Sequence, residues 1–231
     1  TQVVNDYKNE KFVSDVLVID NHSSDNTVKL AKQTGAQVIT KQENLGYGHS
    51  CYLGLKEAIK KDANIIVLTE CDGTFAANDM QKMILYLDNC DMVIGTRQIQ
   101  VLTEKGNQNS MFYVWGNLFI AKLLQLKYFS LLHMGVVTLT DVGCSYRAIR
   151  KDSLEKIISQ LESPHAQKVI YEKKGWLFTI FLTMLGISND LKIVEIPITF
   201  KKRIGTSKSQ ANQKKKGFVY GLHFIWFIIS S

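Results

Sequence analysis

Short apolar runs that end directly in polar or acidic residues constrain the fold of this chain most strongly. Four runs are of this kind, and they cover residues 16–20, 36–39, 64–69 and 91–96. Runs of this length are typical of buried strands in a parallel sheet. Three segments between them have helical spacing, at residues 27–34, 49–61 and 78–87. The alternation predicts an α/β fold with a mostly parallel sheet flanked by helices.

The second half of the chain is richer in large apolar residues and predicts a helical C-terminal extension. Residues 111–139 are apolar but include Lys122 and Lys127, so they predict a core helix or an amphipathic interfacial helix and not a membrane span. Two shorter helices are expected, at residues 153–161 and 176–187. Residues 191–200 predict a strand, and Pro197 favours an edge position because proline cannot donate a ladder hydrogen bond.

Positive charge is concentrated near the C-terminus. The net charge is +7, from 28 basic and 21 acidic residues, and residues 201–216 hold a dense group of lysines and an arginine. This stretch is either a solvated loop or a binding loop for nucleic acid, an anionic membrane or a phosphorylated ligand. Nucleic acid is not expected, because no aromatic residues are interleaved with the cations. We therefore divide the chain into a domain (1–200), a basic phosphate-binding loop (201–216) and the start of an apolar, membrane-associated helix (217–231).

The cysteines and the ends of the chain carry further expectations. The four cysteines form no C-x-x-C pair, so we interpret them as reduced thiols in a cytosolic setting. The chain opens with threonine and a mostly polar stretch, and it stops within an apolar run. We expect a fragment that lacks a first strand and a following membrane segment.

Glu70 and Asp72 form the first candidate site. Residues i and i+2 of an extended segment point the same way, and ligands of open α/β sheets bind beyond the carboxyl ends of the strands. Two carboxylates there can share Mg²⁺ or Mn²⁺, and such a cation can neutralise a diphosphate leaving group. The alternative is an ordinary acidic turn after a strand.

Two polar pairs follow the earlier strands. Asp20 and Asn21 can hydrogen-bond a ribose or a base, or else cap a helix. Gly46 and Gly48 precede a helix, where backbone N–H groups suit phosphate, but such a pair can equally be a tight, closely packed turn.

Two later segments combine acids, glycines and cations. Asp141 and Arg147 belong to one seven-residue segment and could provide a base and a phosphate partner, or a structural salt bridge. Arg203, Ser207 and Lys208 lie in the basic loop and suit phosphate binding.

The order of these motifs is more specific than any one of them. They run as Val18-Ile19-Asp20-Asn21, Asn44-x-Gly46-x-Gly48, Glu70-x-Asp72-Gly73, Gly95-Thr96-Arg97, Asp141-Val142-Gly143-Cys144-x-Tyr146-Arg147 and Glu195-Ile196-Pro197 before Arg203-x-Gly205-x-Ser207-Lys208. This series resembles glycosyltransferase family 2 with the GT-A fold. It is most similar to the branch of dolichol-phosphate mannosyltransferases and bacterial polyprenyl-phosphate or cell-surface glycosyltransferases.

The resemblance implies a role for each position. The nucleotide-sugar positions are Asp20, Asn21, Gly46, Gly48, Glu70, Asp72 and Arg97. Glu70 and Asp72 match the D-x-D position that holds the metal, although the first acid is here a glutamate. Asp141 matches the acceptor-side position where a general base can act. The phosphate or acceptor positions are Arg147, Arg203, Ser207 and Lys208.

The predicted reaction is inverting transfer of a sugar from a nucleoside diphosphate sugar, assisted by Mg²⁺ or Mn²⁺, at the cytoplasmic face of a membrane. The acceptor is a polyprenyl phosphate or a cell-surface glycan. A hydroxyl acceptor needs Asp141 as base, whereas an anionic phosphate acceptor needs none. The basic loop and the apolar segments favour a lipid phosphate. The alternatives are a nucleotidyltransferase on a similar fold and a non-catalytic sugar-nucleotide-binding protein.

Overall fold

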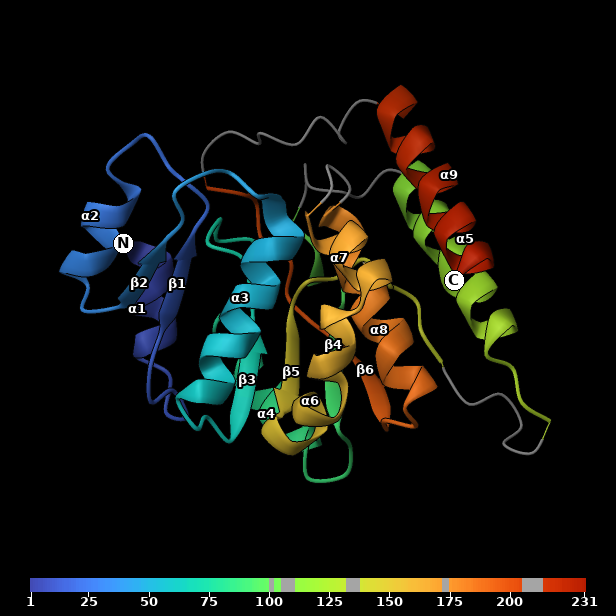
Figure 1. Cartoon of the computed structure of the whole chain (residues 1–231), viewed down its shortest axis with the longest axis horizontal. Helices are drawn as coiled ribbons and strands as arrows, with labels where there is room; N and C mark the ends of the chain where they lie inside the picture. Colours follow the sequence, from blue (N-terminus) through green and yellow to red (C-terminus); the bar gives the residue numbers. More distant parts are fainter. Residues whose placement is uncertain (100–101, 105–110, 132–137, 172–174, 205–213) are drawn as a thin grey trace.

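The computed structural model describes residues 1–99, 102–104, 111–131, 138–171, 175–204 and 214–231 (Figure 1). Helices and strands alternate through the first half, as the apolar runs predict. The elements are α1 (Gln2–Lys8), β1 (Leu17–Asp20), α2 (Thr27–Gln33), β2 (Gln37–Thr40), α3 (Gly46–Lys60), β3 (Ile65–Leu68), α4 (Asp79–Tyr86) and β4 (Met92–Thr96).

The second half is mainly helical and adds two strands. Its elements are α5 (Met111–Lys127), β5 (Arg147–Arg150), α6 (Lys151–Ile158), η2 (Ser159–Glu162), α7 (Pro164–Tyr171), η3 (Gly175–Leu177), α8 (Phe178–Ser188), β6 (Ile193–Pro197) and α9 (Lys214–Ser230).

The described strands form two sheets. β1 and β2 pair in parallel, with Leu17 opposite Gln37. The other four strands have the order β3-β5-β4-β6, in which β4 and β6 are parallel and β5 runs antiparallel to both of its neighbours. β6 lies at the edge, where Pro197 was expected to place it. The predicted α/β fold with a parallel-rich sheet is confirmed.

Helices cover both faces of the larger sheet and position its strands. Figure 1 shows α3, α6, α7 and α8 in front of the sheet and α4 behind it. Every residue of β4 is buried, and this strand lies within the main apolar core. α3 contacts both β1 and β3 and so connects the two sheets. The carboxyl ends of β3, β4 and β6 therefore come together on a rigid base.

Helices α5 and α9 lie side by side at the opposite end from the two-stranded sheet (Figure 1). Lys127 at the end of α5 donates a hydrogen bond to the carbonyl of Ile228, 2.6 Å away, near the end of α9. The two helices thus run in the same direction. Among the described residues, no helix is long and apolar enough to cross a bilayer.

The main differences from the sequence prediction lie in α3, α9, β5 and α7. Helix α3 begins at Gly46 and not near His49, so the two glycines belong to its first turn. Helix α9 begins at Lys214, inside the predicted basic loop. β5 and α7 were not predicted. The β5 sequence has arginine at both ends, a pattern that looks exposed until its pairing with β3 and β4 is known.

Candidate active site

Strand β5 brings one turn between the carboxyl ends of β3 and β4. Because β5 is antiparallel, its first residue, Arg147, lies opposite both Leu68 of β3 and Ile94 of β4. The residues just before Arg147 therefore lie at the edge of the sheet where β3 leads into Glu70 and β4 leads into Arg97. The motif that begins at Asp141 is thereby placed beside the other predicted motifs.

Glu70 is half-buried at the end of β3 and is oriented by this turn. Its Oε1 atom accepts a hydrogen bond of 2.6 Å from the hydroxyl of Ser145. Burial raises the pKa of Glu70, and the neighbouring Asp72 carboxylate raises it further, while Ser145 and Arg97 act in the opposite direction. Sequence reasoning did not select Ser145, because a serine between motif residues carries no chemical signal of its own.

Asp72 uses its two carboxylate oxygens differently. Oδ1 accepts hydrogen bonds from the backbone N–H and the hydroxyl of Thr74, at 3.0 and 2.6 Å. Oδ2 is buried and has no hydrogen bond of good geometry among the described residues, although Nη2 of Arg203 lies 2.7 Å away. The same nitrogen lies 4.0 Å from Oε2 of Glu70. A guanidinium therefore faces both carboxylates.

Glu70 and Asp72 fit a divalent cation that completes its coordination with other ligands. No group of three or more His, Cys, Asp or Glu side chains suited to a metal occurs in the described part of the chain. Two carboxylates are nevertheless the usual protein contribution to a Mg²⁺ site whose remaining ligands are phosphates and water. In the structure, the positively charged guanidinium of Arg203 faces the two carboxylates where a metal ion would bind.

Arg97 and Asp141 form a buried ion pair at the end of β4. The Nε and Nη2 atoms of Arg97 lie 2.6 and 2.7 Å from the two oxygens of Asp141, whose side chain is fully buried. Burial lowers the pKa of Arg97, but the Asp141 carboxylate outweighs it and raises this pKa overall. The predicted phosphate contact of Arg97 and base role of Asp141 stay predictions, and both would require this pair to rearrange.

Glu195 on β6 fixes the turn that carries Asp141. Its carboxylate accepts hydrogen bonds from the backbone N–H groups of Thr140 and Asp141, each at 2.8 Å, and from the Thr140 hydroxyl at 2.6 Å. Burial raises the pKa of Glu195. This carboxylate positions the site and was not among the predicted site residues, although it lies in the quoted motif.

Arg147 lies inside the fold, and its predicted contact with a phosphate or the acceptor stays a prediction that would require its hydrogen-bond partners to rearrange. Its guanidinium donates hydrogen bonds to the carbonyls of Cys144 and Val142 and, at 2.8 Å, to the hydroxyl of Thr183 on α8. The residue is 1% exposed. Its donors thus hold the turn before β5 against α8.

The carboxyl ends of β1 and β2 bring Asp20 and Asn21 beside the glycine turn. Asp20 is buried and accepts a hydrogen bond from the backbone of Ser23. Asn44, which the site prediction omitted, accepts hydrogen bonds from the Asn21 side chain at 2.6 Å and from the Gly46 backbone at 3.0 Å. Oδ1 of Asn21 is buried without a hydrogen-bond donor among the described residues, so it can accept one from a ligand.

The two glycines serve different purposes. Gly46 has a φ of +86° and open space around it, so its backbone is accessible beside Asn21. Gly48 is buried, and a Cβ there would lie 3.0 Å from the carbonyl oxygen of Gly175. Close packing of α3 against η3 therefore accounts for Gly48.

Lys41 is a buried cation under the glycine turn that sequence reasoning did not select. Its Nζ donates hydrogen bonds to the hydroxyl of Ser50 at 2.9 Å and to the Gly46 carbonyl at 3.4 Å. Burial lowers the pKa of Lys41. A lysine that follows a short strand looks exposed in the sequence, and only the fold shows that it supports this turn. Two predicted phosphate ligands, Ser207 and Lys208, lie outside the described residues.

Comparison with solved structures identifies the fold. Glucosyl-3-phosphoglycerate synthase from Mycobacterium tuberculosis, in complex with Mn²⁺, uridine diphosphate and phosphoglyceric acid, matches with a TM-score of 0.55 at 13% identity, over 92% of this chain and 68% of that one. At this identity the likeness shows the fold alone, and the predicted GT-A fold is confirmed.

The chain belongs to glycosyl transferase family 2, whose model matches residues 2–158. It is similar to polyprenol monophosphomannose synthase of Mycolicibacterium smegmatis (28% identity, 84% of this chain and 69% of that protein) and to undecaprenyl-phosphate mannosyltransferase of Micrococcus luteus (27%, 84% and 75%). It is also similar to a UDP-N-acetylglucosamine–dolichyl-phosphate N-acetylglucosaminyltransferase of Methanococcus voltae (27%, 90% and 82%). The predicted family, polyprenyl-phosphate branch and enzyme class are confirmed.

Proposed function

We propose that this protein transfers a sugar, with inversion, from a nucleoside diphosphate sugar to a polyprenyl phosphate, assisted by Mg²⁺ or Mn²⁺. The observation that carries the proposal is the pair Glu70 and Asp72 at the end of β3, facing the guanidinium of Arg203. Acids and a cation so arranged suit a metal-bound diphosphate. The relatives named above act, by their names, on polyprenyl or dolichyl phosphates.

The donor would lie along the edge from β1 to β3. Asp20 and Asn21 would offer acceptors for the nucleoside, and Glu70 and Asp72 would hold a cation that binds the diphosphate. When bound, the cation would neutralise charge on the departing nucleoside diphosphate. Arg203 would add a charge-assisted hydrogen bond to the same phosphates. Asn44 and Lys41 keep the loops on the nucleoside side in place.

The state of Asp141 favours a phosphate acceptor over a hydroxyl. Both of its oxygens are bonded to Arg97, and its side chain is fully buried. A base must reach the proton that it removes, and a buried carboxylate whose two oxygens both accept hydrogen bonds from Arg97 is not placed to do so. A polyprenyl phosphate is already anionic and needs no base. The glycan acceptor stays the second choice.

An exposed apolar face on α5 and α9 supports action at a membrane surface. Five exposed large apolar side chains lie on or just after α5: Trp115, Phe119, Leu126, Phe129 and Leu131. Five more lie on α9: Phe218, Val219, Leu222, Trp226 and Ile229. The sequence has no acid in residues 111–131 or 214–231. Aromatic and cationic residues on one surface favour anionic lipid headgroups.

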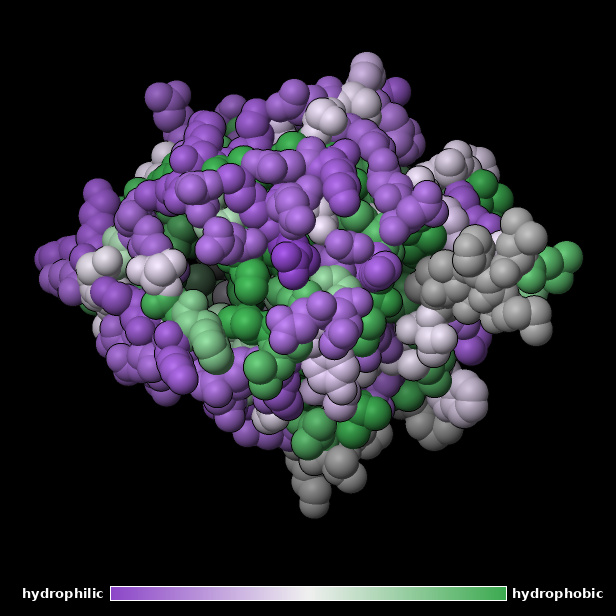
Figure 2. Space-filling model, turned by 90° about the horizontal axis from the view of Figure 1, so that it is seen from below, coloured by the Kyte–Doolittle hydropathy of each residue, from purple (hydrophilic) through white to green (hydrophobic). Residues whose placement is uncertain are grey.

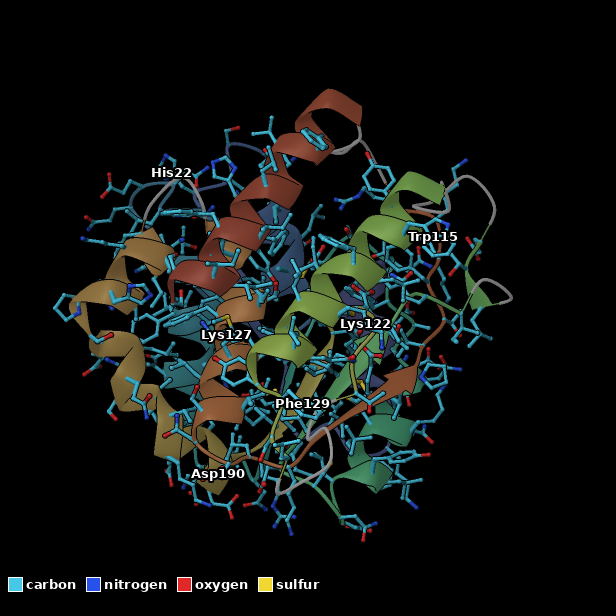
Figure 3. All side chains as sticks on the ribbon, turned by 90° about the vertical axis from the view of Figure 1, so that its right-hand side faces the viewer. His22, Trp115, Lys122, Lys127, Phe129 and Asp190 are labelled. Atoms are coloured by element: carbon cyan, nitrogen blue, oxygen red, sulfur yellow. The ribbon has the colours of Figure 1, made fainter. Side chains whose placement is uncertain are left out.

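This face extends to the end of the molecule that holds the site. Figure 3 shows Trp115 on the same upper side as His22, which follows β1, whereas Asp190, which precedes β6, lies at the bottom. Lys122 and Lys127 lie along α5 between Trp115 and Phe129 (Figure 3). Figure 2 shows the lower end, where hydrophilic residues predominate toward the two-stranded sheet. A lipid headgroup at the upper end of α5 would be near the site.

The cysteines support the cytoplasmic side of that membrane. All four are free thiols, and Cys51, Cys90 and Cys144 are buried. Free thiols are typical of a reducing compartment. We therefore propose the cytoplasmic face, as the sequence predicts.

The test is a donor screen with a defined lipid acceptor. The protein is incubated with labelled nucleoside diphosphate sugars, undecaprenyl phosphate and Mn²⁺ or Mg²⁺, with Asp72→Ala as the inactive variant. We expect one donor to give a lipid-linked sugar and free nucleoside diphosphate. The anomeric configuration of the product, read by NMR, shows inversion or retention.

The same screen separates the two alternatives. Inorganic pyrophosphate is added to a parallel set of samples, in which conversion of the nucleoside diphosphate sugar and pyrophosphate into a nucleoside triphosphate and a sugar 1-phosphate, without a lipid product, indicates a nucleotidyltransferase. Binding of a sugar nucleotide without turnover on any lipid or glycan acceptor indicates a non-catalytic protein. Activity that is equal in the Asp72→Ala variant contradicts the site assignment.

A further inference from the structure

Arg203 stands where the proposed metal would bind. We propose that Arg203 is a built-in competitor of the metal, which neutralises Glu70 and Asp72 while no donor is bound and must leave them before a divalent cation can bind. The inference rests on the metal site of the proposed function. It adds a role for Arg203 in the donor-free protein, besides its contact with phosphate.

The oxygens that a metal needs are the ones that Arg203 faces. Oδ1 of Asp72 is occupied by two hydrogen bonds from Thr74, which leaves Oδ2, 2.7 Å from the guanidinium. Oε1 of Glu70 is occupied by Ser145, which leaves Oε2, 4.0 Å from the same nitrogen. A metal and Arg203 would therefore require the same two atoms.

The main chain holds Arg203 in this position. The backbone N–H of Lys201 donates to the carbonyl of Thr74, and that of Ile204 donates to the carbonyl of Asp72, each at 2.8 Å. The Ile204 side chain covers Gly73, where a Cβ would lie 2.6 Å from its Cδ1 atom. The segment is thus attached to the acidic turn on both sides of Arg203, whatever the arginine side chain contributes.

The guanidinium of Arg203 and a divalent cation are both positively charged and cannot occupy the site at Glu70 and Asp72 together. The side chains of Asp72, Glu70 and Arg203 are 13%, 34% and 38% exposed, so water screens the site only in part. A divalent cation and a guanidinium a few ångströms apart repel each other strongly under such conditions. A donor diphosphate relieves this repulsion, because it offers Arg203 a new anion and the metal new ligands. Metal and donor should therefore bind together, with positive coupling.

Metal affinity without donor tests the proposal directly. Binding of Mn²⁺ alone is measured on the whole chain by the electron paramagnetic resonance of free Mn²⁺. We expect Arg203→Gln to bind Mn²⁺ about tenfold more tightly than the wild type. Lys202→Gln, which removes the exposed cation next to it, should leave the affinity within about twofold. Asp72→Asn should abolish binding in both backgrounds.

Nucleotide is then added to the same samples. Uridine or guanosine diphosphate should strengthen Mn²⁺ binding in the wild type and do so less in Arg203→Gln. Arg203→Ala should behave like Arg203→Gln and serves if the glutamine variant is unstable, as judged by thermal unfolding.

Each outcome decides the proposal separately from the proposed function. It is overturned if both Arg203 variants bind Mn²⁺ no more tightly than the wild type, if Lys202→Gln gives the same gain, or if no variant binds Mn²⁺. Tighter binding in the Arg203 variants without sugar transfer from any donor supports the proposal and contradicts the proposed function. If the wild type transfers sugar but its Arg203 variants bind Mn²⁺ no more tightly, the proposed function is supported and the role of Arg203 as a competitor is overturned.

Discussion

Arg97 donates two parallel hydrogen bonds to Asp141, from Nε to Oδ2 at 2.6 Å and from Nη2 to Oδ1 at 2.7 Å. Truncating Arg97 leaves a fully buried carboxylate without its cation. We expect Arg97→Ala to lower the free energy of unfolding by about 3–5 kcal/mol, measured by urea denaturation. The half-exposed Arg150, paired with Asp152 at 3.5 Å, gives the matched control, with an expected loss of about 1 kcal/mol. Equal losses would show that the buried pair is not special.

The same pair predicts how Asp141→Asn behaves in transfer. With a phosphate acceptor, this variant should lower the rate by disturbing the turn but keep the shape of the pH–rate profile. Loss of one limb of the profile would instead identify Asp141 as the base. The measurement is kcat against pH for both proteins.

The carboxylates of Asp72 and Glu70 should contribute unequally to metal binding. Asp72 is the less exposed, and its backbone turn fixes its position. We expect Asp72→Asn to lower transfer by at least about 100-fold and Glu70→Gln by about tenfold. Initial rates of sugar transfer measure the two losses. Titration with Mn²⁺ in the presence of nucleoside diphosphate then shows whether each variant binds the metal more weakly. The exposed Asp88→Asn is the control, and an equal effect there would point to general charge and not to a site.

Lys41→Met should weaken donor binding without unfolding the protein. The methionine fills the same volume but cannot bond Ser50 or Gly46, so the turn beside Asn21 loses its support. We expect the donor KM to rise about tenfold, equivalent to one lost charge-assisted hydrogen bond. Lys29→Met on the exposed side of α2 is the control. An unchanged KM in Lys41→Met would remove this lysine from the nucleoside side of the site.

Buried thiols predict the stability of the protein in alkali. Burial raises the pKa of both Cys51 and Cys144 from 9.0 to about 12. The unfolded chain therefore loses these protons first, so their contribution is full below pH 9 and is lost as the pH rises toward 12. Each thiol accounts for up to about 4 kcal/mol at the end of that range. Urea midpoints from pH 8 to 10 should fall less steeply in Cys144→Ala, and parallel curves would contradict this.

The apolar face should be measurable with vesicles. Trp115→Ser combined with Phe119→Ser removes two exposed aromatic rings from α5, and we expect about tenfold weaker binding to vesicles that contain anionic lipid. Leu85→Ser combined with Tyr86→Ser on α4 is a control of similar exposure. Co-sedimentation compares the two, and equal losses would show that any apolar surface suffices.

The sequence predicts the strands that consist mainly of apolar residues, because such runs indicate burial. β1, β3 and β4 are apolar runs, and their order with the helices between them is sufficient for the α/β architecture. β5 is different, since Arg147 and Arg150 enclose only two apolar residues. Its place depends on pairing with strands that lie more than fifty residues away, and Arg147 is satisfied by Thr183 on another helix. No local pattern contains that information.

The candidate site divides in the same way. Glu70 and Asp72 could be selected because their spacing and their strand are local features. Asp72 and Arg203 are in contact although they lie 131 positions apart in the sequence. The support of the glycine turn by Lys41 depends on where helix α3 begins. Proximity in the fold, and not residue type, gives Lys41, Asn44, Ser145 and Glu195 their roles.

The antiparallel entry of β5 places one short turn between the positions that we propose for the two substrates. Ser145 of this turn orients Glu70, which we propose to lie at the donor diphosphate, and Asp141 of the same turn, the predicted acceptor-side residue, pairs with Arg97. Glu195 anchors its first residues from β6. A substitution that moves this turn would disturb both Glu70 and Arg97 at once. A change of acceptor during evolution or engineering should therefore arise on α5 and α9, where substitutions leave the turn intact.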